Sequence, residues 1–408
     1  MRSAILLGLV LAAAMEMAGA ERVTVQGLEQ FLASSGSSHA KDGDSIGNTD
    51  LLDEITREDA MAPRIASLEL TERLSRGKRV ELVAKYKLGP LTQSALELLA
   101  DRSALLDLPP GETPVLAPPD SESQKAMVRQ ASEFVFKTLT HLPDFFALLT
   151  TTQFDDGPLY AGGERLAAEP GMHLVGSSER EITFSEGREV FDSSLRGPAS
   201  RKLREEGLGS QGEFGSEAAM IMLDLKTGTL RFERWEGGPT GPVAIFRYAV
   251  PQASSHYQVR YACHGQLAFH AQPGYHGTLS IDPTAGVLVR YTVQADSEAG
   301  DPITQVASAV EYGVVVLGDR RYYCPVRSLA FTLEEADPCH DAHHRVLPRP
   351  VRMLNRIVFT DYHRLGSDMV IVPGQDKSAK PEEGSPDPGP RKAPTTGPDT
   401  QVPPSPNQ

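Results

Sequence analysis

Apolar side chains in the first quarter of the chain recur at intervals of three and four, which is the spacing of one face of an α-helix. The runs cover residues 28–32, 51–74 and 91–105. Thr24 precedes the first run and is a residue type suited to the N-cap position. We expect short helices whose apolar faces pack on another part of the protein.

A proline-rich connector at residues 109–119 follows these runs and cannot continue a helix. The next residues, Ser121-Glu122-Ser123-Gln124, have the form of a capping box. Apolar residues then continue at helical spacing as far as Leu142, and Pro143 disfavours helical backbone at the residue before it. This pattern predicts one more helix, which leads into the second half of the chain.

After residue 157 the pattern changes to short runs rich in β-branched and aromatic residues, separated by Gly, Pro and Asp turns. The predicted strands are Met172–Ser177, Glu181–Ser185, Met220–Leu225, Thr229–Glu236, Val243–Val250, His256–His264, Gly277–Asp282, Val287–Ala295, Ser308–Leu317, Arg320–Leu333 and Arg356–Val372. Hairpin-like turns at Lys226–Gly228, Pro283–Gly286 and Gly318-Asp319 connect several of them. Tight connections without helical crossovers predict an antiparallel meander. Alternation within residues 287–295 predicts one packed face and one wetter face.

The first twenty residues have the three parts of a secretory signal peptide, namely Arg2, an apolar stretch and the small-residue site Ala18-Gly19-Ala20. The apolar stretch is shorter than the roughly 20 residues that a membrane-spanning helix needs. We predict cleavage after Ala20, so that the mature protein begins at Glu21 and is periplasmic or extracellular. An uncleaved anchor is the alternative. No later segment is apolar enough to predict a membrane span.

The C-terminal residues 374–408 consist of Pro, Gly, Ser, Thr and charged residues, with Val402 as the one large apolar side chain. Such a segment cannot bury enough surface to offset the entropy of ordering, so we predict a disordered tail. Pro403-Pro404-Ser405-Pro406 favours polyproline conformations that a partner protein can bind, but a plain solvated tail is the simpler interpretation.

The composition, 40% hydrophobic and 23% charged, is that of an ordinary globular protein. Its formal net charge of −14 argues against a nucleic-acid-binding protein, which would present a basic face. The three cysteines allow one disulfide. We predict a bond between Cys263 and Cys324, which lie in strand-like sequence, and a free Cys339. A meander that places the two Cα atoms more than about 7 Å apart would prevent that bond.

Several short segments together resemble an uncharacterised family of large exported bacterial proteins. These segments are Leu68–Ser75, Gly212-Glu213-Phe214-Gly215, Ser255-His256-Tyr257, Gly274-Tyr275-His276-Gly277, Val310-Glu311-Tyr312-Gly313, Tyr323-Cys324-Pro325-Val326 and Phe359–His363. The resemblance covers nearly the whole mature body and implies no catalytic residues, because no activity is established for that family.

The β part also resembles periplasmic lipoprotein carriers of the LolA type. The resemblance rests on the strand–turn–strand rhythm of Gly277–Leu333 and on the closing strand Phe359–Val372. It implies a curved antiparallel sheet that forms an incomplete barrel around an apolar cavity. The long helical N-terminal part has no counterpart in such a carrier.

Two glycine- or aspartate-rich segments have partial matches to binding motifs. Gly207–Gly212 has G-x-G-x-x-G spacing but follows a charged, helix-like segment and leads toward a strand, so a plain glycine loop is favoured over a nucleotide site. Asp42–Asp53 resembles a calcium loop but has Ile46 at its fifth position and ends in Asp, so a polar linker is favoured.

Histidines provide the other candidate sites. Cys339, His340, His343 and His344 form the densest group of metal-ligand side chains, but they lie in a loop, so adventitious surface binding is favoured over a zinc site. A second group could line a polar pocket, although solvent-facing side chains are favoured. Its members are His256, Tyr257, Tyr261, His264, His270, Tyr275 and His276.

We therefore expect an α+β protein in which N-terminal helices precede a large, curved antiparallel β-sheet. The predicted parts are residues 1–20 (signal peptide), 21–108 (helical region), 109–119 (connector), 120–150 (helix leading into the sheet), 151–373 (β domain) and 374–408 (tail). With no catalytic or cofactor motif, we expect a non-enzymatic envelope protein that binds an apolar or lipidic ligand in the concave sheet. The alternative is a structural or interaction protein that uses the sheet and tail as partner surfaces. A hydrolase is the least supported function.

Overall fold

The computed structural model describes residues 20–36, 58, 60–158, 160–161, 164–165, 171–190, 212–263, 266–337 and 345–365. The predicted signal peptide, apart from Ala20, and the predicted tail at 374–408 lie outside these residues. The chain divides into residues 1–365 and 366–408, and every element below belongs to the first unit.

The N-terminal part is helical, as the apolar spacing predicted. It contains β1 (Glu21–Val23), α1 (Val25–Gly36), a helical stretch at 60–67, β2 (Leu68–Leu70), α3 (Arg76–Tyr86) and α4 (Pro90–Arg102), and β1 pairs with β2 in parallel. Leu28, Leu32, Ile65, Leu82 and Leu96 form its own apolar core. Thr24 caps α1 as predicted, because its Oγ1 accepts a hydrogen bond of 3.0 Å from Gly27 N–H.

The connector contains a short 3₁₀ turn, η2 (Pro110–Glu112), and leads into α5 (Ser121–Glu133). The helix continues as a π-helical turn, η3 (Phe134–Thr138), and a 3₁₀ turn, η4 (Leu139–His141). The predicted cap at Ser121 was one residue late. Asp120 is the N-cap, since its carboxylate accepts from Ser123 N–H at 2.8 Å.

Ten strands form one antiparallel sheet in the order β7-β6-β3-β16-β15-β14-β13-β12-β9-β8. They are β3 (Phe145–Asp155), β6 (His173–Ser185), β7 (Arg188–Val190), β8 (Thr229–Gly237), β9 (Pro242–Val250), β12 (Gly274–Asp282), β13 (Val287–Asp296), β14 (Ile303–Leu317), β15 (Arg320–Asp337) and β16 (Arg345–Arg364). Hairpins β4–β5 (Tyr160–Ala161, Glu164–Arg165) and β10–β11 (Val259–Cys263, Gln266–Ala271) lie outside it, and η5 (Gln252–Ser254) is a 3₁₀ turn. The predicted α+β class and the β12-to-β16 meander are confirmed, and the sheet is open, with β7 and β8 at its edges.

Several predicted elements differ from the structure. Leu68 and Leu70, counted in a helical run, form β2, and the predicted strands at 172–177 and 181–185 are one strand, β6. Met220–Leu225 is not a strand but part of helix α6 (Ser216–Asp224), where Ala218, Ile221 and Met222 are buried at helical spacing. β3 was not among the predicted strands. It begins at Phe145, within the predicted part 120–150, because Phe145, Ala147 and Leu149 alternate inward after Pro143.

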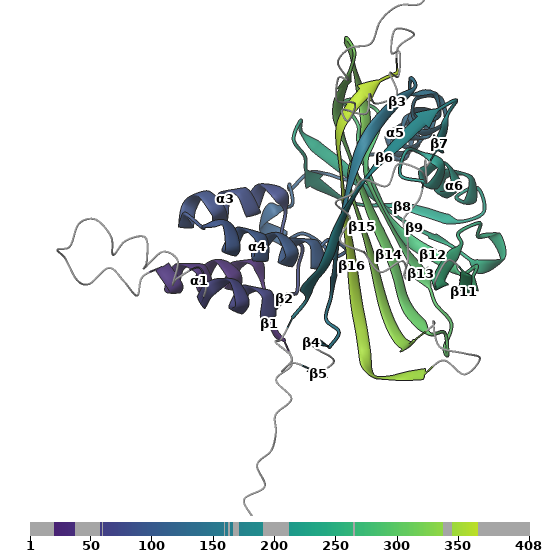
Figure 1. Ribbon diagram of the computed structural model, residues 1–408. Helices are drawn as coiled ribbons and strands as arrows, with labels where there is room; N and C mark the ends of the chain where they lie inside the picture. The colour runs from purple at the N-terminus through teal and green to yellow at the C-terminus, as the bar shows by residue number, and fades with distance from the viewer. Residues whose placement is uncertain are drawn as a thin grey trace, which may run out of the picture. The chain divides into compact units, whose positions relative to one another are not determined.

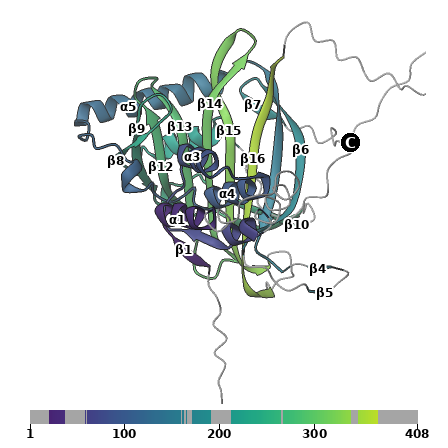
Figure 2. The same cartoon turned by 90° about the vertical axis from the view of Figure 1, so that its left-hand side faces the viewer.

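The two faces of the sheet are covered differently. Figure 1 shows α5 and α6 on one side of the sheet and α1, α3 and α4 on the other. The face toward α5 and α6 carries the main core, which includes Phe145, Phe184, Tyr248, Tyr275 and Tyr291. Figure 2 shows α3 and α4 in front of the central strands on the opposite face. Apolar contacts there are few, and Leu98 of α4 packs with Phe154 and Leu354.

The face with the main core is concave. Residues 212–224, which comprise a short turn and α6, contact strands from both halves of the sheet, including β7 through Glu189. Phe214 packs on Phe145 (β3), Phe184 (β6) and Phe359 (β16) with ring centroids 5.4–5.9 Å apart. Hydrogen bonds join the same segment to Tyr275 (β12), Tyr291 (β13) and Tyr312 (β14). One segment of this length reaches so many strands because the sheet bends around it (Figure 1).

Candidate functional site

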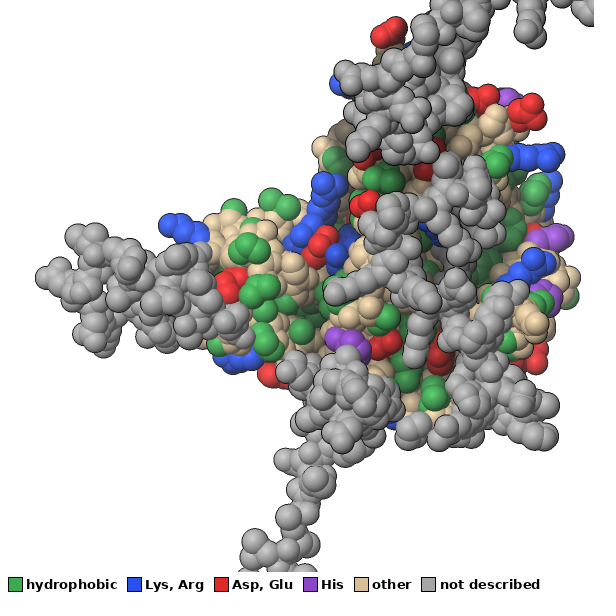
Figure 3. All heavy atoms as spheres, in the orientation of Figure 1, with side chains coloured by type: hydrophobic (Ala, Val, Ile, Leu, Met, Phe, Trp, Pro, Cys, Tyr) green, Lys and Arg blue, Asp and Glu red, His purple; other side chains and the backbone are tan. Residues whose placement is uncertain are grey.

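A small polar cavity lies between the N-terminal helical part and the opposite face of the sheet. Its volume is about 20 Å³. It is lined by Arg73, Leu105, Leu106, Asp107, Arg234, Glu236, Ile245, Arg247, Thr278, Ser280, Arg290, Thr292 and Gln294. The lining comes from the loops after β2 and α4 and from strands β8, β9, β12 and β13. Figure 3 shows basic and acidic side chains together where the helical part meets the sheet.

Alternation along the strands places the polar lining on one face. Arg290, Thr292 and Gln294 of β13 line the cavity, whereas Tyr291 and Val293 between them are fully buried in the main core. A period of two has this effect because successive side chains of a strand point to opposite faces. The wetter face predicted for this strand is therefore the one that meets the helical part.

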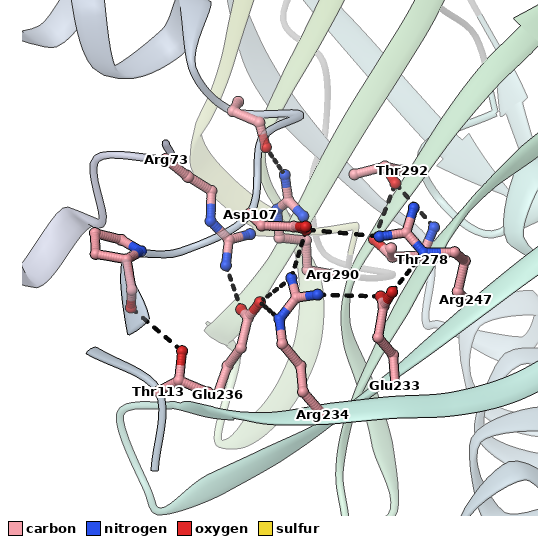
Figure 4. Close-up of polar contacts among 12 residues, drawn as sticks. Arg73, Asp107, Thr113, Glu233, Arg234, Glu236, Arg247, Thr278, Arg290 and Thr292 are labelled. Carbon is pink, nitrogen blue, oxygen red and sulfur yellow. Dashed lines mark hydrogen bonds and ion pairs between the residues drawn. The ribbon is translucent and has the colours of Figure 1, made fainter. Parts of the chain in front are cut away.

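Carboxylates and guanidinium groups interleave around the cavity (Figure 4). Glu236 binds Arg73 through Oε2 and Arg234 through Oε1, the latter at 2.7 Å. Glu233 binds Arg234 and Arg247 through its two oxygens, at 3.0 and 2.7 Å. Hydrogen bonds to charged groups of this kind are stronger than neutral ones, so they fix the network in place.

Asp107 connects this network to the helical part. Its Oδ1 lies 2.8 Å from Arg234 Nη2 and 3.6 Å from Arg247 Nη2. Its backbone carbonyl accepts a hydrogen bond of 2.8 Å from Arg73 N–H. The loop that follows α4 is thereby held against β8 and β9.

Arg290 is the guanidinium group with the weakest carboxylate contact in the cavity. Its Nη2 donates to the Ala104 carbonyl at 2.6 Å, while its Nε lies 3.9 Å from Glu311. Its side chain is 13% exposed. Burial, together with the positive charge of Arg73, lowers the pKa of Arg290 to about 10, so it stays protonated at neutral pH.

A second ionic cluster lies beside the cavity and also joins the two parts. Asp101 of α4 is fully buried and pairs with both Arg327 of β15 and Arg356 of β16. Glu97, one turn earlier, lies 3.0 Å from Arg356. Every acidic group in the two clusters has a guanidinium partner. Both clusters therefore serve to hold the helical part against the sheet.

Carboxylates are also gathered on the concave face. Glu217 of α6 accepts hydrogen bonds from Tyr291 Oη at 2.8 Å and Ser308 Oγ at 3.4 Å. Glu189 of β7 accepts from the backbone N–H groups of Gly212 and Phe214 at 3.1 and 3.0 Å. Burial, with a further contribution from the negative charge of Glu213, raises the pKa of Glu189 and of Glu217 to about 7. In the described part of the chain neither glutamate has a lysine or arginine partner.

His256, one of the histidines considered for a polar pocket, is paired with a buried aspartate. Asp224, buried at the end of α6, accepts from the His256 backbone N–H at 2.9 Å and lies 2.5 Å from His256 Nδ1. Tyr275 donates to the same carboxylate at 2.8 Å. The imidazole is 76% exposed. Among the described residues, no hydroxyl or thiol is hydrogen-bonded to its other nitrogen.

The predicted histidine and tyrosine group does not form one pocket. Tyr257 and Tyr275 pack in or against the main core, Tyr261 packs in a separate cluster with Val259, and His276 pairs with Asp296 near the surface. His270 faces Arg260 in the β10–β11 hairpin, and His264 lies outside the described residues.

The other predicted sites fall largely outside the described part of the chain. Cys339, His340, His343 and His344 lie there, as do the calcium-like segment 42–53 and, apart from Gly212, the glycine motif at 207–212. Among the described residues, no group of three or more His, Cys, Asp or Glu side chains is arranged to hold a metal ion.

The cysteine pair predicted to form a disulfide is only partly described. Cys324 is a buried, free thiol in β15, and burial raises its pKa to about 12. Cys263 ends β10, and its side chain lies outside the described residues. The bond between them is not observed and stays a prediction.

The arginine–carboxylate network was not predicted, because its contacts join residues far apart along the chain, such as Arg73 and Glu236, which are 163 residues apart. The available signal was the polar side of β13, where Arg290, Thr292 and Gln294 alternate with apolar residues. The acidic partners in the helical part gave no comparable signal.

No helix in the described ranges has both the length and the apolar character needed to cross a bilayer. No family model matches the chain, and neither the curated proteins nor the solved structures contain a match to it. The resemblances to an uncharacterised exported family and to LolA-type carriers therefore stay predictions.

Proposed function

We propose that this chain is a non-enzymatic exported protein that binds an apolar or lipidic ligand on the concave face of its sheet, where residues 212–224 now lie. The proposal rests on which side chains meet where residues 212–224 contact the strands. The strands contribute aromatic and aliphatic side chains, whereas the covering segment brings Glu217 among them. The cover thus buries a carboxyl group against a surface of aromatic and aliphatic side chains.

The buried carboxyl group of Glu217 lowers the free-energy cost of exchanging this cover for an apolar ligand. A carboxyl group taken out of water costs free energy even when it is hydrogen-bonded, and more when it is ionised. An acyl chain in the same place would bury apolar surface at about 25 cal/mol per Å² without that cost. The resemblance to LolA-type carriers is consistent with a ligand at this position.

Binding of a fluorescent fatty-acyl probe at pH 8 tests the proposal. The proposal predicts saturable binding that lipid extracted from the native envelope displaces. Glu217→Gln keeps a hydrogen-bonding group but no negative charge, so it should hold the cover more firmly and weaken probe binding. Glu179→Gln, on an exposed position of β6, is the matched control and should bind as the wild type does.

Absence of saturable binding would reject the ligand-binding function, and equal binding by both variants would reject the role of Glu217 in the cover. A second candidate, a structural or interaction protein, is favoured by the extent of packing on the concave face, where Phe214, Tyr248 and Tyr275 are each at most 2% exposed. Native mass spectrometry separates the two. Protein from its own envelope that carries lipid mass supports a carrier, and protein that carries only partner-protein mass supports the second function.

A further inference from the structure

Arg290 is the arginine of the polar cavity that lies farthest from its carboxylate partner, at 3.9 Å from Glu311. Both oxygens of Glu233 and of Glu236 are engaged by Arg73, Arg234 and Arg247. Asp107 Oδ1 is shared between Arg234 and Arg247. Arg290 has instead a neutral carbonyl and a carboxylate 3.9 Å away, which is beyond hydrogen-bond distance.

Hydroxyl groups lie on the same cavity wall. Thr292 Oγ1 accepts from Thr278 N–H at 2.9 Å and lies 2.9 Å from Thr278 Oγ1. Two hydroxyls that share one hydrogen bond retain one O–H that can donate elsewhere. The cavity therefore offers a guanidinium group whose hydrogen-bonded acceptor is a neutral carbonyl, and a hydroxyl pair with one further O–H to donate.

We propose that this cavity binds a small monovalent anion of the size of chloride, held by Arg290 and by the hydroxyl pair of Thr278 and Thr292. The size follows from the volume, about 20 Å³, because a cavity needs roughly 10–15 Å³ to hold one water molecule. A tetrahedral oxyanion such as phosphate is too large. A bound anion neutralises Arg290 and stabilises the contact of the 103–108 loop with the sheet. This site is on the face away from the proposed ligand and does not depend on it.

The test is a titration of the full chain with sodium chloride in a gluconate buffer, followed by the line width of the ³⁵Cl resonance. Arg290→Met removes the main anion ligand, and Arg231→Met, an exposed arginine on β8, is the matched control. We expect saturable broadening in the wild type and in Arg231→Met, and its loss in Arg290→Met. Thr278→Val should weaken binding roughly tenfold, as expected for one hydrogen bond to an anion.

Thr278→Val keeps the test decisive if Arg290→Met fails to fold, because it retains every charge of the network. Wild-type protein without saturable broadening would overturn the proposal, and so would broadening that is unchanged in the folded variants at positions 290 and 278. Phosphate at the same concentration should leave the chloride signal unchanged. Displacement by phosphate would overturn the assignment of a small monovalent anion.

Discussion

At the scale of single residues, the glycines of two sequence segments have clear physical roles. Gly215 has φ +122°, and a Cβ there would lie 2.9 Å from Leu139 Cβ, so this position needs glycine for both conformation and space. Gly277 needs it for space alone, since a Cβ would lie 1.9 Å from the Thr292 carbonyl oxygen. The first allows Phe214 to enter the concave core, and the second allows β12 and β13 to pair closely.

Asp101 is the residue on which docking of the helical part depends most. It is fully buried and faces two guanidinium groups, and burial with the charge of Arg356 lowers the pKa of Arg327 to about 10. Asp101→Asn would leave Arg327 without its anionic partner and Arg356 with Glu97 alone, and should lower the free energy of unfolding by about 3–5 kcal/mol. Urea unfolding followed by circular dichroism measures the change.

Glu122→Gln is the matched control for that substitution. Glu122 is 84% exposed and pairs with Lys125 one turn away, so its loss should change stability by less than about 0.5 kcal/mol. Equal effects of the two substitutions would contradict the central role of Asp101.

At the scale of elements, the stability of the segment formed by residues 212–224 should depend on pH. Glu189 and Glu217 have pKa values near 7 in the folded protein, compared with an ordinary value of 4.5. Between these values the folded protein binds more protons than the unfolded chain, so stability falls as pH rises through that window. The loss is at most about 3 kcal/mol for each group and is complete above about pH 7.

Hydrogen exchange of α6 measures this effect. Amide protection in α6 should be higher at pH 5 than at pH 8, after correction for the intrinsic exchange rates. In Glu217→Gln the difference should shrink, because one titrating group is gone and Glu189 remains. Protection that rises with pH would show that the two carboxyl groups are not the controlling ones.

At the scale of the whole molecule, the helical part and the sheet should stay together without a covalent link. The helical part has its own core, and contacts with the sheet extend from Glu69, 3.5 Å from Arg352, to Asp107. A protease site introduced at the fully exposed Val115 of the connector would cut between them. We expect both fragments to co-elute in gel filtration at physiological salt.

The same cleavage in the Asp101→Asn variant tests whether the ionic interface holds the fragments together. Loss of the buried anion should let the fragments separate, or separate at lower salt than in the cleaved wild type. Separation of the wild-type fragments directly after cleavage would mean that the connector, rather than the ionic interface, holds the parts together.

The sequence alone determined the class of fold, because periodicity is a local property. Spacing of three and four predicted the N-terminal helices, and alternation with tight turns predicted the meander from β12 to β16. Tertiary structure decided what local patterns cannot encode. α6 is helical where β-branched and aliphatic residues suggested a strand, since its Ile221 and Met222 are buried against the sheet. The arginine network and the glutamates of the concave face depend on contacts between residues that are distant in sequence, and only the folded chain brings those charges together.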